Sequence, residues 1–166
     1  LGMQLHYISR TEYSSKHTEE FLNRLKEQFG NVYIIPEGGG NIEGVVGCKD
    51  IVKEVNNDFD YVMTDCGTGA TLAGINLALN TNQKAVGIAV LKGGTFIIEE
   101  VKRFYELMNE DLIHLKRIDL ITDYHFGGYA KHKQELITFM RDLYKQTGVK
   151  TDPVYTGKLF FALIDL

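Results

Sequence analysis

The sequence has few cysteines, no long apolar run and no excess of positive charge, and each shortage narrows the class of protein. Its two cysteines, Cys48 and Cys66, fall in different predicted elements, which favours two free thiols in a reducing cytoplasm over a disulfide scaffold. No apolar run is long enough to span a bilayer, and residues 1–6 lack the basic and apolar regions of a signal peptide. The net charge of −4 argues against nucleic acid or a membrane as a partner.

What the sequence does contain is a regular alternation of strand-like and helical segments. Its 166 residues, 44% of them hydrophobic, are enough for one domain with a buried core. The pattern predicts a three-layer α/β fold with a mostly parallel sheet flanked by helices. The expected strands are Met3–Ile8, Val32–Ile35, 61–66, 85–91 and 118–121. The expected helices are 18–29, 42–55, 71–79, 96–108, 133–146 and a last helix that starts within residues 151–158 and continues to residue 166. Ser9–His17 is interpreted as a polar connection.

One glycine loop joins a buried strand to a helix in the middle of the chain. It is formed by Cys66-Gly67-Thr68-Gly69-Ala70-Thr71. A helix that begins on such a loop presents unpaired N–H groups and a partial positive charge, which suits a phosphate. Short glycine motifs also match by chance, so an ordinary strand–helix turn remains the alternative. Two further loops, Gly38–Asn41 and Tyr124–Tyr129, are expected at the same edge of the sheet.

Other chemistries fit the sequence less well. The Gly67-x-Gly69 motif lacks the third glycine and the acidic residue of a dinucleotide site, and no Walker lysine follows it. His125 and His132 lie near Asp123, but neither their spacing nor a third ligand supports a metal site. Cys66 has no evident base and is interpreted as a small residue at a strand end. A phosphate site remains, without a metal.

Three tyrosines stand out because two of them lie in glycine-flanked loops. Tyr124, Tyr129 and Tyr155 could stack on a cofactor, donate a hydrogen bond or move a proton. By residue type alone, surface or packing roles are equally compatible with them.

Four motifs together resemble one known family. Ile34-Ile35-Pro36-Glu37-Gly38-Gly39-Gly40-Asn41, the Cys66–Gly74 loop, Gly128-Tyr129-Ala130 and, most specifically, Asp152-Pro153-Val154-Tyr155-Thr156-Gly157-Lys158 resemble segments of the 1-aminocyclopropane-1-carboxylate deaminase / D-cysteine desulfhydrase family. These are pyridoxal-phosphate enzymes that share the fold of the tryptophan synthase β subunit. The resemblance covers nearly the whole chain.

The resemblance implies a role for each matching residue. The backbone of Gly67–Thr71, including Gly69 and Ala70, and the hydroxyls of Thr68 and Thr71 would hold the cofactor phosphate. Tyr155 would be the acid–base group, Tyr129 would flank the same site, and Thr156 would face the pyridine nitrogen. Gly39 and Asn41 would belong to a substrate loop.

The resemblance also implies the reaction. A neutral Thr156, where deaminase-type members carry glutamate, favours β-elimination from D-cysteine with release of ammonia over opening of a cyclopropane. The expected substrate is a small amino acid, and the expected assembly is a homodimer or another self-associated form.

Part of the family pattern has no counterpart in this sequence. The Gly-Asn-Lys segment with the Schiff-base lysine is missing, and Lys158 is not its equivalent. We therefore expect a fragment, inactive alone, in which residues 1–16 are a remnant of the smaller domain and residues 17–166 form a C-terminally truncated cofactor domain. The alternative is a non-catalytic Rossmann-like module that binds another phosphate-bearing ligand.

Overall fold

A computed structural model describes residues 2–56 and 58–166, so Leu1 and Asn57 lie outside the described part of the chain. The described residues form two compact units, one that ends at Ile35 and one that begins at Pro36. The boundary proposed at residues 16 and 17 from the sequence stays a prediction, because the division into units does not test which part derives from which domain.

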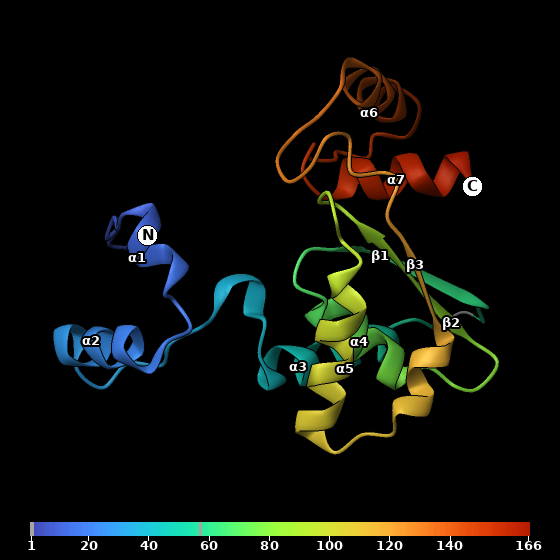
Figure 1. Cartoon of the computed structure of the whole chain (residues 1–166). Helices are drawn as coiled ribbons and strands as arrows, with labels where there is room; N and C mark the ends of the chain where they lie inside the picture. The colour runs from blue at the N-terminus through green and yellow to red at the C-terminus, as the bar shows by residue number, and fades with distance from the viewer. Residues whose placement is uncertain (1, 57) are drawn as a thin grey trace. The chain divides into compact units, whose positions relative to one another are not determined.

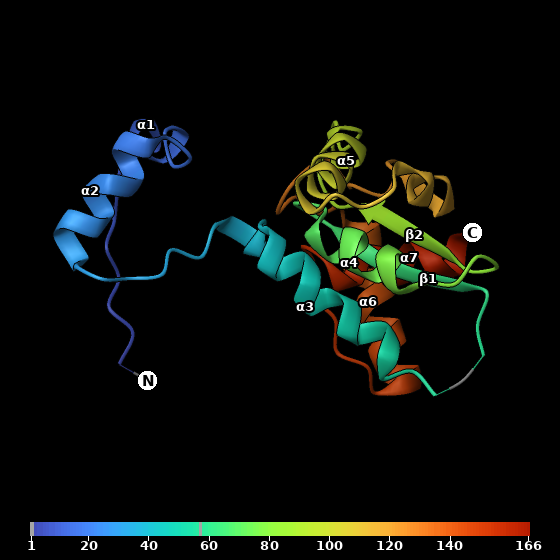
Figure 2. The same ribbon diagram turned by 90° about the horizontal axis from the view of Figure 1, so that it is seen from below.

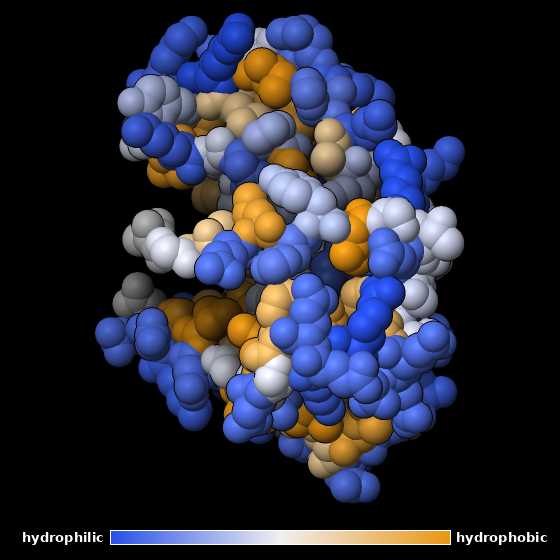
Figure 3. All heavy atoms as spheres, turned by 90° about the vertical axis from the view of Figure 1, so that its left-hand side faces the viewer, coloured by the Kyte–Doolittle hydropathy of each residue, from blue (hydrophilic) through white to orange (hydrophobic). Residues whose placement is uncertain are grey.

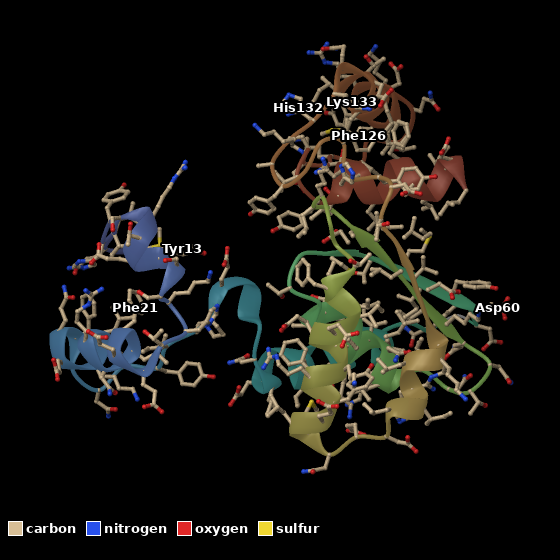
Figure 4. All side chains as sticks on the ribbon, in the orientation of Figure 1. Tyr13, Phe21, Asp60, Phe126, His132 and Lys133 are labelled. Carbon is tan, nitrogen blue, oxygen red and sulfur yellow. The ribbon has the colours of Figure 1, made fainter. Side chains whose placement is uncertain are left out.

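The first unit consists of two helices, α1 (Arg10–Ser14) and α2 (Glu19–Phe29). Thr18 caps α2, since its side chain accepts a hydrogen bond from the Phe21 backbone at 3.3 Å, which confirms the helix predicted to begin there. Phe21 is the buried residue of α2 and is labelled in Figure 4. The polar connection predicted for Ser9–His17 is wrong in part, because Ser9 and Glu12 form a capping box that starts α1.

Two predicted strands do not form. Met3–Ile8 and Val32–Ile35 have no strand structure, and Met3, Tyr7 and Ile35 are largely exposed. Strand-like composition needs a neighbouring strand to satisfy its backbone groups, and the described residues pair no strand with either segment.

The second unit is built on a three-stranded parallel sheet in the order β1-β2-β3 (Figure 1). Its strands are β1 (Tyr61–Cys66), β2 (Lys84–Ala89) and β3 (Ile118–Ile121). Cys66 pairs with Ala89, so β1 and β2 end at the same edge. The predicted three-layer α/β architecture with a parallel sheet is confirmed.

Helices cover both faces of this sheet (Figures 1 and 2). On one face, Val45, Leu72, Ile97 and Phe104 belong to the main buried cluster. On the other face, Ala162 packs on Val86 and Ile88. The first face carries α3 (Ile42–Lys53), α4 (Ala70–Ala78) and α5 (Phe96–Met108), the second carries α7 (Thr156–Asp165) with α6 (Gln134–Thr147) packed on it, and short 3-10 helices span Glu37–Gly39 and Leu112–Arg117.

Helices α3 and α4 approach each other closely at Gly74. A Cβ on Gly74 would lie 2.3 Å from the Val45 carbonyl oxygen and 2.6 Å from the Cys48 Cβ. Only a residue without a side chain permits this distance between the two helices. The sequence of α4, Thr71-Leu72-Ala73-Gly74, therefore fixes how α3 is placed as well.

The surface alternates between hydrophilic and hydrophobic patches on the face drawn in Figure 3. Across the described residues, we find no helix with both the length and the apolar character that crossing a membrane requires.

Candidate functional site

The loop between β1 and α4 forms the floor of the candidate site. Gly69 immediately precedes α4 with φ of 85°, a left-handed conformation that suits glycine. The N–H groups in the first turn of a helix have no partner within the helix, and no described side chain caps those of α4. These are the donors that a phosphate group binds at a helix N-terminus.

The Gly38–Asn41 loop lies directly against this floor. A Cβ on Gly38 would lie 2.8 Å from the Cγ2 of Thr68, so the two loops touch. Gly39, like Gly38, has φ of 62°. The Asn41 side-chain oxygen accepts a hydrogen bond from the Gly44 backbone at 2.9 Å and thereby caps α3. Gly39 and Asn41 therefore lie at the site, and Asn41 also stabilises the start of α3.

Tyr155 and Tyr129 meet above the same floor. A Cβ on Gly67 would lie 3.6 Å from the Tyr155 hydroxyl. The Tyr155 hydroxyl donates a hydrogen bond to the Tyr129 hydroxyl at 3.3 Å, and the two rings form an edge-to-face pair with centroids 6.0 Å apart. That hydrogen bond, together with burial, raises the pKa of Tyr155 to about 12.

Asp152 holds the start of α7, where Tyr155 and Thr156 lie. Its carboxylate accepts the N–H groups of Val154, Tyr155 and Thr156 at 2.8–3.1 Å. Burial raises the pKa of Asp152, but the Thr156 hydroxyl and these N–H groups outweigh it and bring the pKa to about 2. The Thr156 hydroxyl donates to Asp152 at 2.6 Å, so its proton is already committed.

Asp65 lies at the end of β1 beside the glycine loop. Burial, and then the charge of Asp152, raise the pKa of Asp65. The side of the site below Tyr155 is therefore acidic, in contrast to the backbone donors of α4.

Lys158 is a residue that sequence reasoning passed over. It is fully buried on α7, and its ammonium donates hydrogen bonds to the backbone carbonyls of Val90, His125 and Gly128 at 2.8–3.0 Å. Burial lowers its pKa. A signal existed in the sequence, because Lys158 lies four residues before Ala162 and so shares the apolar face of α7.

Cys66 is a core residue and not a nucleophile. Only 2% of it is exposed, and burial, followed by the nearby Asp65, raises the pKa of its thiol to about 12. Among the residues that the structure describes, no group of three or more His, Cys, Asp or Glu side chains could hold a metal ion. The His125 Nδ1 instead accepts a hydrogen bond from the Gly127 backbone at 2.9 Å.

Comparison with known proteins identifies a matching family and several named relatives. The family model described as "Pyridoxal-phosphate dependent enzyme" matches residues 1–166. A putative 1-aminocyclopropane-1-carboxylate deaminase of Pyrococcus furiosus is 35% identical over 91% of this chain and 50% of its own length. A bifunctional D-cysteine desulfhydrase/1-aminocyclopropane-1-carboxylate deaminase of Arabidopsis thaliana is 30% identical over 99% of this chain and 45% of its own length.

A solved structure also matches most of this chain. The crystal structure of an ACC deaminase homologue superimposes with a TM-score of 0.79 and 30% sequence identity, covering 98% of this chain and 53% of that chain. A D-cysteine desulfhydrase of Serratia proteamaculans is 28% identical over 88% of this chain. The chain spans about half the length of the curated relatives it matches.

Proposed function

The chain belongs to the pyridoxal-phosphate dependent enzyme family, and from that premise we propose that its second unit holds the cofactor of a lyase acting on a small amino acid. The reaction that we propose is β-elimination from D-cysteine or a similar substrate with release of ammonia. Support comes from relatives named D-cysteine desulfhydrase and 1-aminocyclopropane-1-carboxylate deaminase.

The observation that carries the proposal is the meeting of the Gly67–Thr71 loop with Tyr155. The uncapped first turn of α4 offers N–H donors for a phosphate, and Gly67 leaves the space beside the Tyr155 hydroxyl open. The residues present therefore fit the phosphate and ring of pyridoxal phosphate, with the hydroxyls of Thr68 and Thr71 beside the backbone donors.

Bound pyridoxal phosphate would supply the electron sink for a carbanion next to the amino group. The chain's own tyrosines would handle protons. Tyr155, with its pKa of about 12, is protonated at neutral pH and can hold or deliver a proton, while Tyr129 fixes the direction of its hydroxyl.

Thr156 favours the desulfhydrase reaction over ring opening. We place it near the pyridine nitrogen, where its hydroxyl offers no proton because that proton goes to Asp152. An uncharged partner at this position gives a weaker electron sink, which is sufficient when the leaving group is a thiol.

Binding of a cofactor analogue without an aldehyde tests the proposal. Isothermal titration of the chain with 4′-deoxypyridoxine 5′-phosphate avoids reaction with surface lysines, and 4′-deoxypyridoxine without the phosphate is the matched control. We expect the phosphorylated compound to bind at least about tenfold more tightly, which corresponds to about 1.4 kcal/mol. Equal affinity, or no binding of either compound, would contradict the proposal, and preferential binding of NAD or a nucleotide would favour the Rossmann-like module.

Location and assembly complete the proposal. The two free cysteines, one of them buried, support a cytoplasmic location. The outer edges of β1 and β3 pair with no other strand among the described residues, which supports self-association as a homodimer. Light scattering coupled to size-exclusion chromatography would measure the mass, and a monomer at micromolar concentration would contradict the dimer.

A further inference from the structure

Lys158 places a positive charge in the interior of the second unit. Burying an ammonium is strongly unfavourable unless its donors are satisfied. All three donors of Lys158 are satisfied, and all three acceptors are backbone carbonyls: Val90 at 2.8 Å, Gly128 at 2.9 Å and His125 at 3.0 Å. No carboxylate accepts a hydrogen bond from Lys158 among the described residues, so the charge serves to hold backbone.

The three carbonyls belong to two segments that are far apart in the sequence. Val90 directly follows β2, whereas His125 and Gly128 lie in the loop between β3 and α6. In that loop Phe126 has φ of 51° and Gly128 has φ of 130°. Figure 4 labels Phe126 in this loop, next to α7, and its ring contacts the ring of Phe161 with centroids 5.0 Å apart. A non-glycine residue keeps a left-handed conformation like that of Phe126 only where the surroundings hold it.

One tyrosine of the site is attached to a group that Lys158 holds, and the other lies on the same helix as Lys158. Tyr129 directly follows Gly128, and Tyr155 lies three residues before Lys158 at the start of α7. The Lys158 backbone N–H also donates to the Tyr155 carbonyl at 3.0 Å. One side chain therefore connects the loop that carries Tyr129 to the helix that carries Tyr155.

We propose that Lys158 is a positioning residue whose ammonium holds Tyr129 against Tyr155 and so sets the hydrogen bond between their hydroxyls. Its catalytic meaning rests on the proposed function, but the placement itself does not. Loss of the ammonium leaves the His125 and Gly128 carbonyls only their hydrogen bonds within the loop, from the backbone N–H groups of Gly128 and Lys131 at 3.0 and 3.1 Å. The loop then loses this tie to α7, and Tyr129 moves out of reach of Tyr155.

The test measures the Tyr155 hydroxyl in the chain without any cofactor. Tyrosines are replaced with 3-fluorotyrosine, whose lower intrinsic pKa allows titration at milder pH, and ¹⁹F resonances are assigned with Tyr155→Phe and Tyr129→Phe. In the unsubstituted protein the hydrogen bond to Tyr129, with burial, raises the pKa of Tyr155 from 10.0 to about 12. The quantity compared between variants is the difference between the pKa of the fluorinated Tyr155 and the pKa of an exposed fluorotyrosine.

We expect Lys158→Met to remove most of this elevation, as Tyr129→Phe does, and the double variant to lower the Tyr155 pKa no further than either change alone. Lys131→Met removes an exposed lysine of the same loop and is the matched control, which leaves the Tyr155 pKa unchanged. If Lys158 only stabilised the fold, Lys158→Met would lower the unfolding midpoint but leave the Tyr155 pKa elevated. That result would overturn the proposal.

A second variant keeps the proposal testable if Lys158→Met does not fold. Lys158→Gln keeps a neutral donor that is too short to reach three carbonyls, so the same fall in the Tyr155 pKa is expected. An unchanged pKa in a folded Lys158→Gln variant overturns the proposal. Failure of the cofactor analogue to bind would contradict the proposed function alone, because this titration contains no cofactor.

Discussion

Replacing Gly67 with alanine separates ligand binding from folding. A Cβ at this position would lie 3.6 Å from both the Cε1 and the hydroxyl of Tyr155, which is an ordinary van der Waals distance. Gly67 is not among the glycines with positive φ, so alanine can adopt its backbone conformation. A glycine-to-alanine change at a compatible site stabilises a protein by about 0.4–1 kcal/mol. We expect the free energy of unfolding of Gly67→Ala to be unchanged or slightly raised.

Ligand binding should respond in the opposite direction. The new methyl group occupies the space between the glycine loop and the Tyr155 hydroxyl, where we place the cofactor ring. Overpacking of a fitted space costs about 1–3 kcal/mol, and this corresponds to about 5- to 150-fold weaker binding of 4′-deoxypyridoxine 5′-phosphate. Isothermal titration gives the affinity, and urea unfolding followed by circular dichroism gives the stability.

Gly47→Ala is the matched control for this variant. Gly47 lies on the exposed side of α3 with no atom within 4 Å of its would-be Cβ, so alanine should raise stability by about 0.5–1 kcal/mol and leave the affinity unchanged. If Gly67→Ala and Gly47→Ala bound the analogue equally well, the space beside Tyr155 would not be the ligand site. A fall in the stability of Gly67→Ala would show that the reasoning about its backbone is wrong.

Three further changes test the packing and electrostatics of the second unit. Gly74→Ala should destabilise the protein by about 1–3 kcal/mol in urea unfolding, since its Cβ would meet Val45 and Cys48 on α3; an unchanged midpoint would contradict the close helix contact. The pKa of Asp152 lies at about 2, below its usual 3.8, so its contribution to stability is present above pH 3.8 and is lost as the pH falls from 3.8 to 2. Urea unfolding of the wild type and of Asp152→Asn at several pH values measures this loss. Because the carboxylate is partly solvated, the loss should be no more than about 1 kcal/mol. Cys66 should not react with a thiol reagent at pH 8 until urea unfolds the chain, and labelling of the folded protein at Cys66 would show that it is accessible.

The spacing of apolar residues and the positions of the glycines predicted the helices and strands of the second unit well. The apolar run at Tyr61–Cys66, the glycines that follow it and the helical spacing of Phe96–Met108 are local signals, and each formed the predicted element. The sequence order also placed Gly67–Thr71 and Tyr124–Tyr129 at one edge of the sheet, because β1 and β3 end there. The Gly38–Asn41 loop reaches the same site although the strand predicted before it does not form.

The strand predictions were wrong where the structure depends on residues distant in the sequence. Met3–Ile8 and Val32–Ile35 have strand composition, but a strand forms only beside a partner, and pairing is a long-range property. The apolar face of α7 indicates that Lys158 is buried, but the hydrogen-bond partners of Lys158 are again a long-range property. Its three acceptors lie 30, 33 and 68 residues away in sequence, and no local pattern reveals carbonyls that converge only in the folded chain.

Four helices of the second unit begin around one small space. Helix α4 starts on the glycine loop, Gly38 brings the start of α3 against Thr68, Gly69 lies beside Ile97 at the start of α5, and Gly67 lies beside Tyr155 at the start of α7. Each helix N-terminus carries about half a positive charge. Asp152 and Asn41 cap α7 and α3, so the positive backbone potential at this point comes from the starts of α4 and α5, which no described side chain caps. Such a site distinguishes ligands by charge state: it prefers a phosphate dianion to the monoanion, so affinity for a phosphate ester should decline as the pH falls below about 6.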